Sequence, residues 1–353
     1  MASTPRRVLI TGANGFIAAQ TVSRFLSSGW TVRGTVRDLS SPSAQSLAKH
    51  FAPAQAAGSF ELVSVRDIRA PGAFDDAVRG CHAVAHLATP VVFDSGDVEY
   101  IVGTAVQGTL SILESALKAT RAGDAIESVV LMSSVAAVRM ATPGFATFTE
   151  KDWNTRAEDE VRELGDKAYG HIIYAASKVA SERAFWKWMG EKKSPFAATS
   201  VNPCWVAGPP LYLPDSPEDI PETTSFIWKV FAGQEFPPGP TGHGSHVDVR
   251  DVARMTEWAA SHPETTGGER YIVGGNGNVG VPQAVADILR KAYPERRNII
   301  KEGTPGEGYQ PGYASDPSKF HLDSSKAVKA TGQEWIPYDQ MVLDTAKLFE
   351  AYL

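Results

Sequence analysis

The chain has 353 residues, enough to bury a sizeable core in one large domain or two unequal lobes. A net charge of −6 without blocks of like charge excludes a nucleic-acid-binding stripe, and no apolar run is long enough to span a membrane. Only two cysteines are present and the first residues lack a secretory signal, so we expect a cytoplasmic protein without a disulfide framework.

Between residues 6 and 202, short apolar runs alternate with longer helical patterns, which is typical of βαβ units around a parallel sheet. The runs are almost entirely apolar, as expected where helices cover both faces of the sheet. We expect strands at residues 7–11, 31–36, 60–65, 83–87, 128–132 and 198–202. We expect helices at residues 16–28, just before Gly29, and at 97–118, with an Asp at the start.

The segment 207–240 is punctuated by prolines and contains the aromatic residues Phe226, Trp228 and Phe231. This composition predicts a loop-rich insertion with a single helix, well placed to serve as a lid or specificity lobe. After it, we expect a strand at 270–273 and helices at 281–293 and 339–352.

A glycine-rich loop follows the first expected strand and opens a helix, with the sequence TGANGFIA at residues 11–18. Small residues allow the backbone to approach a pyrophosphate and direct the N–H groups of the helix N-terminus at its charge. Such a loop can also be a simple strand-to-helix turn. Its place after the first strand of a βαβ series favours dinucleotide binding.

The end of the second expected strand bears on the choice of dinucleotide, because an acidic residue there suits NAD and an Arg suits NADP. Arg37 favours NADP, although Asp38 beside it could still bind the ribose. After the third strand, Asp67 could accept from the adenine amino group and Ile68 could cover the ring. A surface Asp in a turn is the alternative.

Tyr174 stands four residues before Lys178, which places both side chains on one face of a helix. A nearby ammonium lowers the pKa of a phenol, which then becomes a general acid or base near neutral pH. Taken alone, the pair also fits an ordinary amphipathic helix. Ser133 and Ser134 at the end of the fifth strand favour catalysis, since a hydroxyl at this edge of a parallel sheet can orient a carbonyl oxygen.

These motifs resemble the extended short-chain dehydrogenase/reductase family, and most of all its fungal and yeast aldehyde, ketone and methylglyoxal reductases and its plant dihydroflavonol reductases. The matching segments occur in the right order over most of the chain: residues 11–18, 32–37, 67, 86–89, 133–134, 174–178, 202–203 and 246–253. The resemblance implies an α/β fold, a Rossmann-type doubly wound parallel sheet with a smaller, loop-rich C-terminal substrate lobe.

The resemblance also implies two parts of the chain with different roles. An NADP-binding Rossmann domain is expected from residues 1–203, with 244–275 contributing, and a substrate-binding lobe from residues 204–243 and 276–353. It implies reduction of an aldehyde or ketone by NADPH, with Tyr174 as general acid, Ser134 orienting the carbonyl and Lys178 tuning Tyr174 and binding the ribose. Cofactor contacts are expected at Gly12, Asn14, Gly15, Phe16, Ile17, Arg37, Asp67, Ile68, Leu87, Ala88, Thr89, Tyr174, Lys178 and Pro203.

The family's Asn on the fourth helix is replaced here by Ala105, so a proton relay through that Asn is not expected. Nucleotide-sugar epimerases and dehydratases share the fold and the triad, and a non-catalytic NADP-binding protein is a further alternative. Dehydratases need acidic residues just after the strand-end hydroxyl, where this chain has Val135 and Ala136. Non-catalytic members tend to have lost the Tyr or the Lys, and this chain keeps both Tyr174 and Lys178.

An aromatic-walled pocket for an apolar or aromatic carbonyl substrate is expected from Val91, Phe93, Trp205, Tyr212 and Phe226, although any one of them could simply pack the second lobe. His243 and His246 lack a third ligand nearby, so we expect no metal site. We expect a monomer or a homodimer.

Overall fold

The computed structural model describes residues 5–89, 97–234, 245–274, 282–302 and 320–353. Its chain divides into two compact units. The first contains Met1–Ala141, Glu150–Asn202 and Ala253–Tyr271, and the second contains Thr142–Thr149, Pro203–Val252 and Ile272–Leu353. The functional division into a cofactor domain and a substrate lobe stays a prediction.

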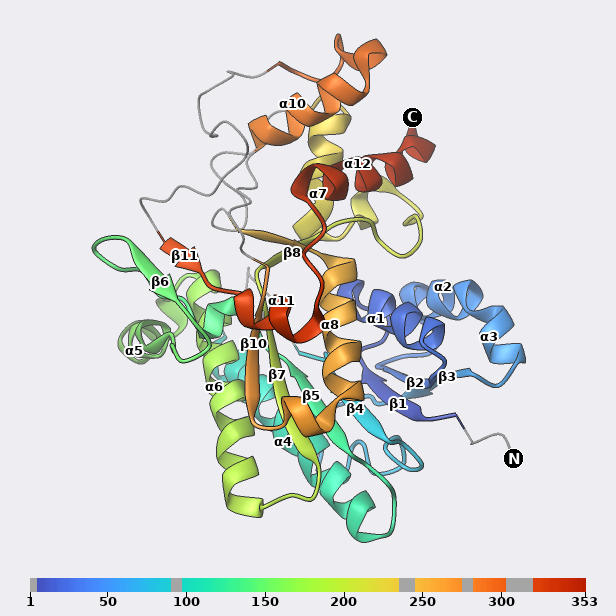
Figure 1. Cartoon of the computed structure of the whole chain (residues 1–353), viewed down its shortest axis with the longest axis vertical. Helices are drawn as coiled ribbons and strands as arrows, with labels where there is room; N and C mark the ends of the chain where they lie inside the picture. The colour runs from blue at the N-terminus through green and yellow to red at the C-terminus, as the bar shows by residue number, and fades with distance from the viewer. Residues whose placement is uncertain (1–4, 90–96, 235–244, 275–281, 303–319) are drawn as a thin grey trace. The chain divides into compact units, whose positions relative to one another are not determined.

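A seven-stranded sheet forms the centre of the first unit, in the order β10-β7-β5-β4-β1-β2-β3 (Figure 1). All pairings from β3 through to β7 are parallel. The strands are β1 (Arg7–Thr11), β2 (Thr31–Val36), β3 (Phe60–Ser64), β4 (Ala83–His86), β5 (Ser128–Met132), β7 (Ala197–Pro203) and β10 (Glu269–Val273). The strand order reverses between β1 and β4, which confirms the predicted doubly wound fold and marks the edge where such sheets bind ligands.

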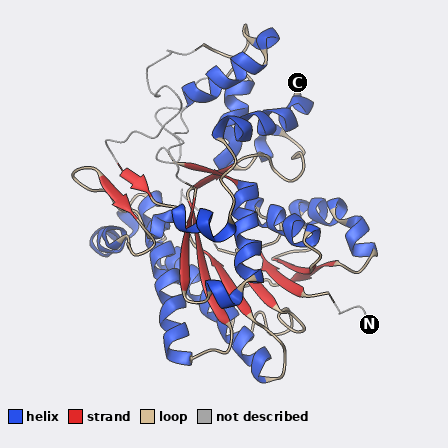
Figure 2. Ribbon diagram, viewed as in Figure 1, coloured by secondary structure: helices blue, strands red, loops and turns tan. Residues whose placement is uncertain are grey.

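Helices cover both faces of this sheet, as the layered view in Figure 2 shows. The helices that belong wholly or mostly to the first unit are α1 (Phe16–Ser27), α2 (Pro42–His50), α3 (Ala52–Ala56), α4 (Val98–Arg121), α5 (Thr155–Leu164), α6 (Gly170–Lys192), α8 (Val249–Ser261) and α9 (Pro263–Thr266). Local signals explain two of the boundaries. Gly29 follows α1 with a φ of +83°, and the Asp97 side chain caps α4 by accepting from the N–H of Tyr100 at 2.8 Å.

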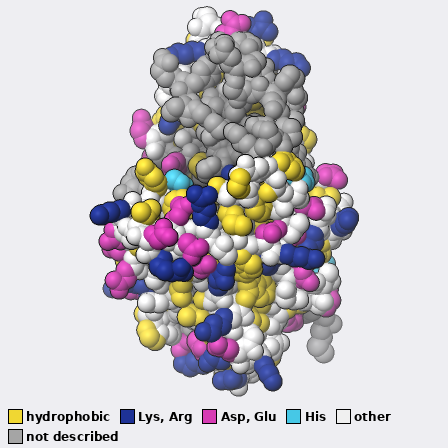
Figure 3. All heavy atoms as spheres, turned by 90° about the vertical axis from the view of Figure 1, so that its left-hand side faces the viewer, with side chains coloured by type: hydrophobic (Ala, Val, Ile, Leu, Met, Phe, Trp, Pro, Cys, Tyr) yellow, Lys and Arg dark blue, Asp and Glu magenta, His cyan; other side chains and the backbone are white. Residues whose placement is uncertain are grey.

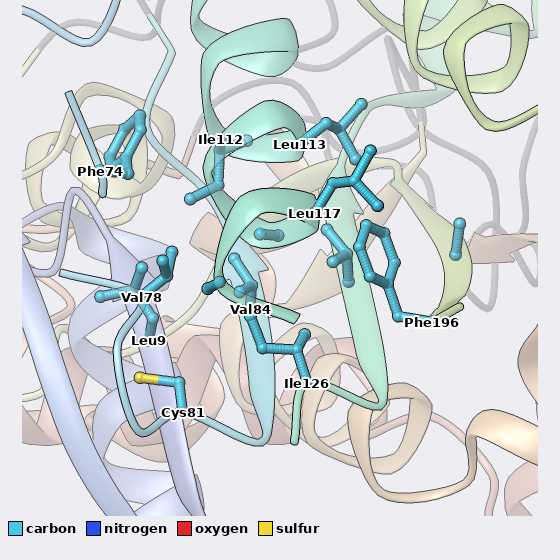
Figure 4. Close-up of a cluster of buried hydrophobic side chains, with 14 of the residues drawn as sticks. Leu9, Phe74, Val78, Cys81, Val84, Ile112, Leu113, Leu117, Ile126 and Phe196 are labelled. Carbon is cyan, nitrogen blue, oxygen red and sulfur yellow. The ribbon is translucent and has the colours of Figure 1, made fainter. Parts of the chain in front are cut away.

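One face of the sheet buries a hydrophobic cluster beneath α4 and α6 (Figure 4). Leu9 from β1 and Val84 from β4 meet Ile112, Leu113 and Leu117 of α4 there, and all five are at most 3% exposed. The side chains of α4 recur at helical spacing on its buried face, so the same residues that define the helix also anchor it to the sheet.

The second unit has its own core and two small parallel sheets, in which β6 (Ala146–Phe148) pairs with β11 (Phe320–Leu322) and β8 (Trp205–Ala207) pairs with β9 (His246–Asp248). Its helices are α7 (Glu222–Phe231), α10 (Pro282–Ala292), α11 (Ser325–Thr331) and α12 (Tyr338–Phe349). Residues of α7, α10 and α12 share one hydrophobic cluster. The single helix expected within the proline-rich segment is α7.

Lys and Arg side chains are interspersed with Asp and Glu side chains on the described surface drawn in Figure 3. A search of the described helices finds none whose length and apolarity would let it cross a membrane. Cys81 and Cys204 are both buried, and neither forms a disulfide.

We predict that Leu113→Ala lowers the free energy of unfolding by about 2–5 kcal/mol, because it opens a cavity in a fully buried cluster. Urea unfolding followed by circular dichroism measures the change. Leu164→Ala, at a position where the side chain is 46% exposed, is the matched control and should change the stability by less than about 1 kcal/mol. Equal losses in the two variants would contradict the assignment of this core.

Candidate active site at the carboxyl edge of the sheet

Ser134 lies just beyond the carboxyl end of β5, next to Ser133. Its hydroxyl accepts a hydrogen bond from the backbone N–H of Ala136 at 3.1 Å, which caps the short 3-10 helix that follows. Its backbone carbonyl accepts from Nδ2 of Asn202 at 3.2 Å. The residue is therefore fixed through both its side chain and its main chain, and it is only 9% exposed.

Tyr174 and Lys178 lie one turn apart on α6, as their spacing predicts. The phenol of Tyr174 is partly buried and forms a hydrogen bond with the hydroxyl of Ser134. The Lys178 side chain is buried, its Nζ donates to the carbonyl oxygen of Met132 at 3.1 Å, and Nζ lies 5.8 Å from the centre of the Tyr174 ring. The three residues predicted as a catalytic group thus lie together.

Burial dominates the protonation of this group. It raises the pKa of Tyr174 above its ordinary value, and the hydrogen bond from Ser134 opposes the shift. It lowers the pKa of Lys178 to about 8, with Glu182 opposing. The pKa of Tyr174 is raised overall because desolvation of the phenol outweighs the hydrogen bond from Ser134, and the tuning of Tyr174 by Lys178 stays a prediction. At neutral pH the phenol is protonated and able to donate a proton.

Glu182, one turn beyond Lys178 on α6, has a fully buried carboxylate. It accepts hydrogen bonds from the hydroxyl of Ser133 at 2.6 Å and from that of Ser200 at 2.7 Å. Nδ2 of Asn202 donates to it at 2.8 Å. Because Asn202 also binds the Ser134 carbonyl, this carboxylate ties α6 to the strand ends that carry the candidate site.

The charge of Glu182 is balanced by Arg270 of β10, whose Nε donates to it at 2.7 Å. Nη1 of Arg270 donates to the carbonyl oxygens of Glu150 and Asp152 at 2.6 and 2.7 Å. The guanidinium also lies 3.9 Å from the centre of the Trp153 ring. A buried ion pair needs such additional partners to offset the cost of desolvation.

Sequence reasoning missed this ion pair. One signal was available, because Glu182 repeats the four-residue spacing of Tyr174 and Lys178 on the same helix face. Arg270 offered none, since it stands 88 positions from Glu182 and only the packing of β10 beside β7 brings the two together.

A second buried network joins the ends of β1 and β4, where Thr11 and His86 are register partners. Thr11 Oγ1 accepts from the backbone N–H groups of Leu87 and Ala88, both at 3.0 Å. Its one proton therefore goes to Nδ1 of His86, at 2.9 Å. Burial lowers the pKa of His86 to about 3, so the ring is neutral with its hydrogen on Nε2. Leu87 and Ala88, two predicted cofactor contacts, are thereby fixed, and the partly buried Thr89 follows them.

The glycine loop has the geometry that a pyrophosphate requires. Gly12 has a φ of +66°, and a Cβ added there would lie 3.2 Å from Cα of Ala88. At Gly15 the helix α1 begins without a side-chain cap, which leaves the N–H groups of its first turn, Phe16 and Ile17 included, free of a capping side chain. Asn14 donates to Ser43 Oγ at 2.8 Å and braces the loop. The loop therefore fits a dinucleotide.

Arg37 is exposed directly after β2. The neighbouring carboxylate of Asp38 is turned into its own loop, where one oxygen accepts from the backbone N–H of Ser40 at 2.8 Å and from its hydroxyl at 2.7 Å. These hydrogen bonds lower the pKa of Asp38. At this strand end, Asp38 is therefore occupied by Ser40, whereas the side chain of Arg37 has no partner among the described residues.

Asp67 is paired with Arg69, which donates from Nε at 2.9 Å and from Nη2 at 2.8 Å to its two oxygens. This pairing lowers the pKa of Asp67 to about 2. An adenine amino group would therefore share the carboxylate with Arg69. Ile68 packs closely on Gly108 of α4, where an added Cβ would lie 2.7 Å from its Cδ1.

The predicted substrate-pocket residues fall into three groups. Val91 and Phe93 lie outside the described residues. In the second unit, Phe226 is 3% exposed and packs against the ring of His246 at 5.5 Å, which favours a core role for it. Trp205 and Tyr212 are partly exposed there, and Trp205 Nε1 donates to the carbonyl of Thr223 at 2.8 Å.

Three further positions that the sequence analysis considered lie in the second unit or outside the described residues. Pro203 is the last residue of β7. His246 is buried, which lowers its pKa to about 3, whereas His243 falls outside the described residues. A search of the described residues finds no group of three His, Cys, Asp or Glu side chains that could hold a metal ion.

Comparisons with known proteins identify the family of this chain. A family model described as the NAD dependent epimerase/dehydratase family matches residues 8–274. The chain belongs to this family. The NADPH-dependent methylglyoxal reductase GRE2 of Saccharomyces cerevisiae is 31% identical over 349 residues, 96% of each chain. A bifunctional dihydroflavonol 4-reductase/flavanone 4-reductase of Pyrus communis is 30% identical over 84% of this chain and 79% of its own.

A solved structure, yeast methylglyoxal/isovaleraldehyde reductase Gre2 complexed with NADPH, superposes with a TM-score of 0.81 at 28% identity and covers 98% of this chain and 100% of its own. Membership of the epimerase/dehydratase family confirms the resemblance to extended short-chain dehydrogenases/reductases that the sequence motifs indicate. The matched segment contains Ser134, Tyr174 and Lys178, and also the buried pair of Glu182 and Arg270.

We predict that Glu182→Gln lowers the free energy of unfolding by about 3–5 kcal/mol, because it leaves the buried charge of Arg270 without a counterion. Urea unfolding measures the loss. Glu158→Gln is the matched control, since Glu158 pairs with Arg183 at 3.4 Å near the surface, and it should cost less than about 1 kcal/mol. A similarly small effect at Glu182 would show that the buried pair does not support this part of the family fold.

Proposed function

We propose that this chain is a carbonyl reductase that uses NADPH to convert an aldehyde or a ketone into an alcohol. The observation that carries the proposal is the hydrogen bond between Ser134 and Tyr174, with the Lys178 ammonium on the same helix face, at the carboxyl edge of a doubly wound sheet. Relatives named as reductases that match 84–96% of the chain support it.

NADPH is the cofactor that the chain's own residues fit. The uncapped start of α1 and the tight turn at Gly12 suit a pyrophosphate, and the exposed Arg37 suits a 2′-phosphate better than a hydroxyl. Asp38, which would favour NAD, is engaged by Ser40. The cofactor supplies a hydride to the carbonyl carbon.

The protein supplies the proton and the orientation. Tyr174, which is protonated at neutral pH, donates its phenolic proton to the carbonyl oxygen as the hydride reaches carbon, so the product is the neutral alcohol. Ser134 hydrogen-bonds the same oxygen and fixes its position. Lys178 contributes a positive charge that stabilises the phenolate left behind and binds the nicotinamide ribose.

Ala105 offers only a methyl group on α4, where it is 3% exposed, so the proton that restores Tyr174 does not come through an Asn at this position. For the substrate, Trp205 and Tyr212 remain candidates for an aromatic wall, which favours an apolar or aromatic carbonyl compound.

We predict that Tyr174→Phe lowers kcat for NADPH-dependent reduction by about 10²–10⁴-fold, because the general acid is removed. NADPH oxidation is followed by absorbance against aryl ketones, β-keto esters and aldehydes, with NADH in parallel. NADPH binding, measured by fluorescence, should persist in the variant. Tyr169→Phe changes an equivalent hydroxyl on a side chain that is 75% exposed, and its activity should equal that of the unmodified chain.

Two outcomes would overturn the proposal. Equal activity of Tyr174→Phe and Tyr169→Phe would exclude Tyr174 as the acid. Tight NADPH binding without turnover of any carbonyl compound would favour a nucleotide-sugar epimerase or dehydratase activity, or a non-catalytic NADP-binding role.

A further inference from the structure

Two arginines project from adjacent strand ends in the first unit. Arg37 is the first residue after β2, and Arg66 is the second residue after β3. The strands are parallel with Val36 opposite Ser64, and the pairing continues past their ends, since the N–H of Val65 donates to the Val36 carbonyl at 2.8 Å. Neighbouring strands lie about 4.8 Å apart, so both long side chains start within reach of one small anion.

The loops that carry the two arginines are joined to each other. Ser64 Oγ donates to the carbonyl of Arg37 at 3.0 Å, which fixes the backbone of one strand end against the other. Each arginine also acts electrostatically on the aspartate of the other loop. The pKa of Asp38 is lowered mainly by its hydrogen bonds with Ser40 and to a smaller extent by Arg66. The pKa of Asp67 is lowered mainly by its hydrogen bonds with Arg69 and to a smaller extent by Arg37.

The other charges in this cluster already have partners. Asp38 accepts from Ser40, and Asp67 is bound in two places by Arg69, whose guanidinium also lies 5.5 Å from the centre of the Tyr100 ring. The side chains of Arg37 and Arg66 form no hydrogen bond and no close ion pair with any residue that the structure describes. Three arginines against two aspartates leave a local excess of one positive charge on a chain whose net charge is −6.

We propose that Arg66 is a second ligand of the 2′-phosphate of NADPH, acting together with Arg37, and is therefore a residue that determines cofactor specificity. The inference rests on the proposed use of NADPH. A 2′-phosphate carries close to two negative charges, which one arginine alone does not neutralise, and guanidinium groups from two loops can bind different phosphate oxygens.

The test measures binding of two fragments by calorimetry, without catalysis: adenosine 2′,5′-bisphosphate, which carries the 2′-phosphate, and ADP, which lacks it. We predict that Arg66→Gln weakens binding of the bisphosphate at least about 10-fold and changes binding of ADP less than about 2-fold, because charged hydrogen bonds to one phosphate are lost. Arg37→Gln should give the same pattern.

Arg79→Gln is the matched control. It removes the same charge from a side chain that is 71% exposed. Arg79 precedes β4 and so lies at the amino ends of the strands, whereas Arg37 and Arg66 lie at the carboxyl ends, so the substitution should affect binding of neither ligand. In the enzyme, Arg66→Gln should raise the KM for NADPH with kcat unchanged.

Three results would overturn the role of Arg66: an unchanged affinity for the bisphosphate, an equal loss for both ligands, or a loss matched by Arg79→Gln. The binding data for the unmodified chain distinguish these three results from a failure of the proposed cofactor. If the unmodified chain binds ADP as tightly as the bisphosphate, the NADPH preference itself fails and the role of Arg66 with it. If the preference survives Arg66→Gln unchanged, only the role of Arg66 fails.

Discussion

The buried carboxylate of Glu182 is the constraint on which the first unit depends. It lies on α6 and accepts hydrogen bonds from side chains that follow or belong to β5, β7 and β10. Three sheet elements and one helix therefore have to adopt a single arrangement for this charge to be compensated. Since α6 also carries Tyr174 and Lys178, and Asn202 also binds the carbonyl of Ser134, the same arrangement sets the geometry of the candidate site.

The electrostatics of that site suit a proton donor. A tyrosine that has to protonate a substrate oxygen must keep its own proton until hydride transfer, and burial ensures this by disfavouring the phenolate. The buried Lys178 has the opposite problem, because burial disfavours its charge, and Glu182 one turn away opposes the loss. The carboxylate thus acts on the site through charge as well as through position.

Much of the first unit could be predicted from the sequence. The expected strands agree with the observed ones to within a residue at either end, because helices on both faces make parallel strands almost uniformly apolar. The sequence also predicted Ser134, Tyr174 and Lys178 as one group, because the end of a strand and a four-residue spacing on a helix are local features that can be recognised in a sequence.

Contacts between distant segments could not be predicted. Arg270 contacts Glu182 only because β10 packs beside β7 in the sheet. Three-residue strands such as β6 and β11 are defined by pairing with each other rather than by their own sequence pattern. Asp67 shows a different limit, since its pairing with Arg69 depends on how a loop turns.

The long separation of Glu182 and Arg270 in the sequence has a consequence for the order of assembly. Residues 1–202 supply Ser134, Tyr174, Lys178 and Glu182, but the cation that compensates Glu182 is synthesised only with β10. Until β10 joins β7, burial of the carboxylate is opposed by several kcal/mol of desolvation, which disfavours docking of α6 onto the sheet. During synthesis on the ribosome, the ion pair that fixes α6 can therefore form only after Arg270, in the last strand of the sheet, has emerged.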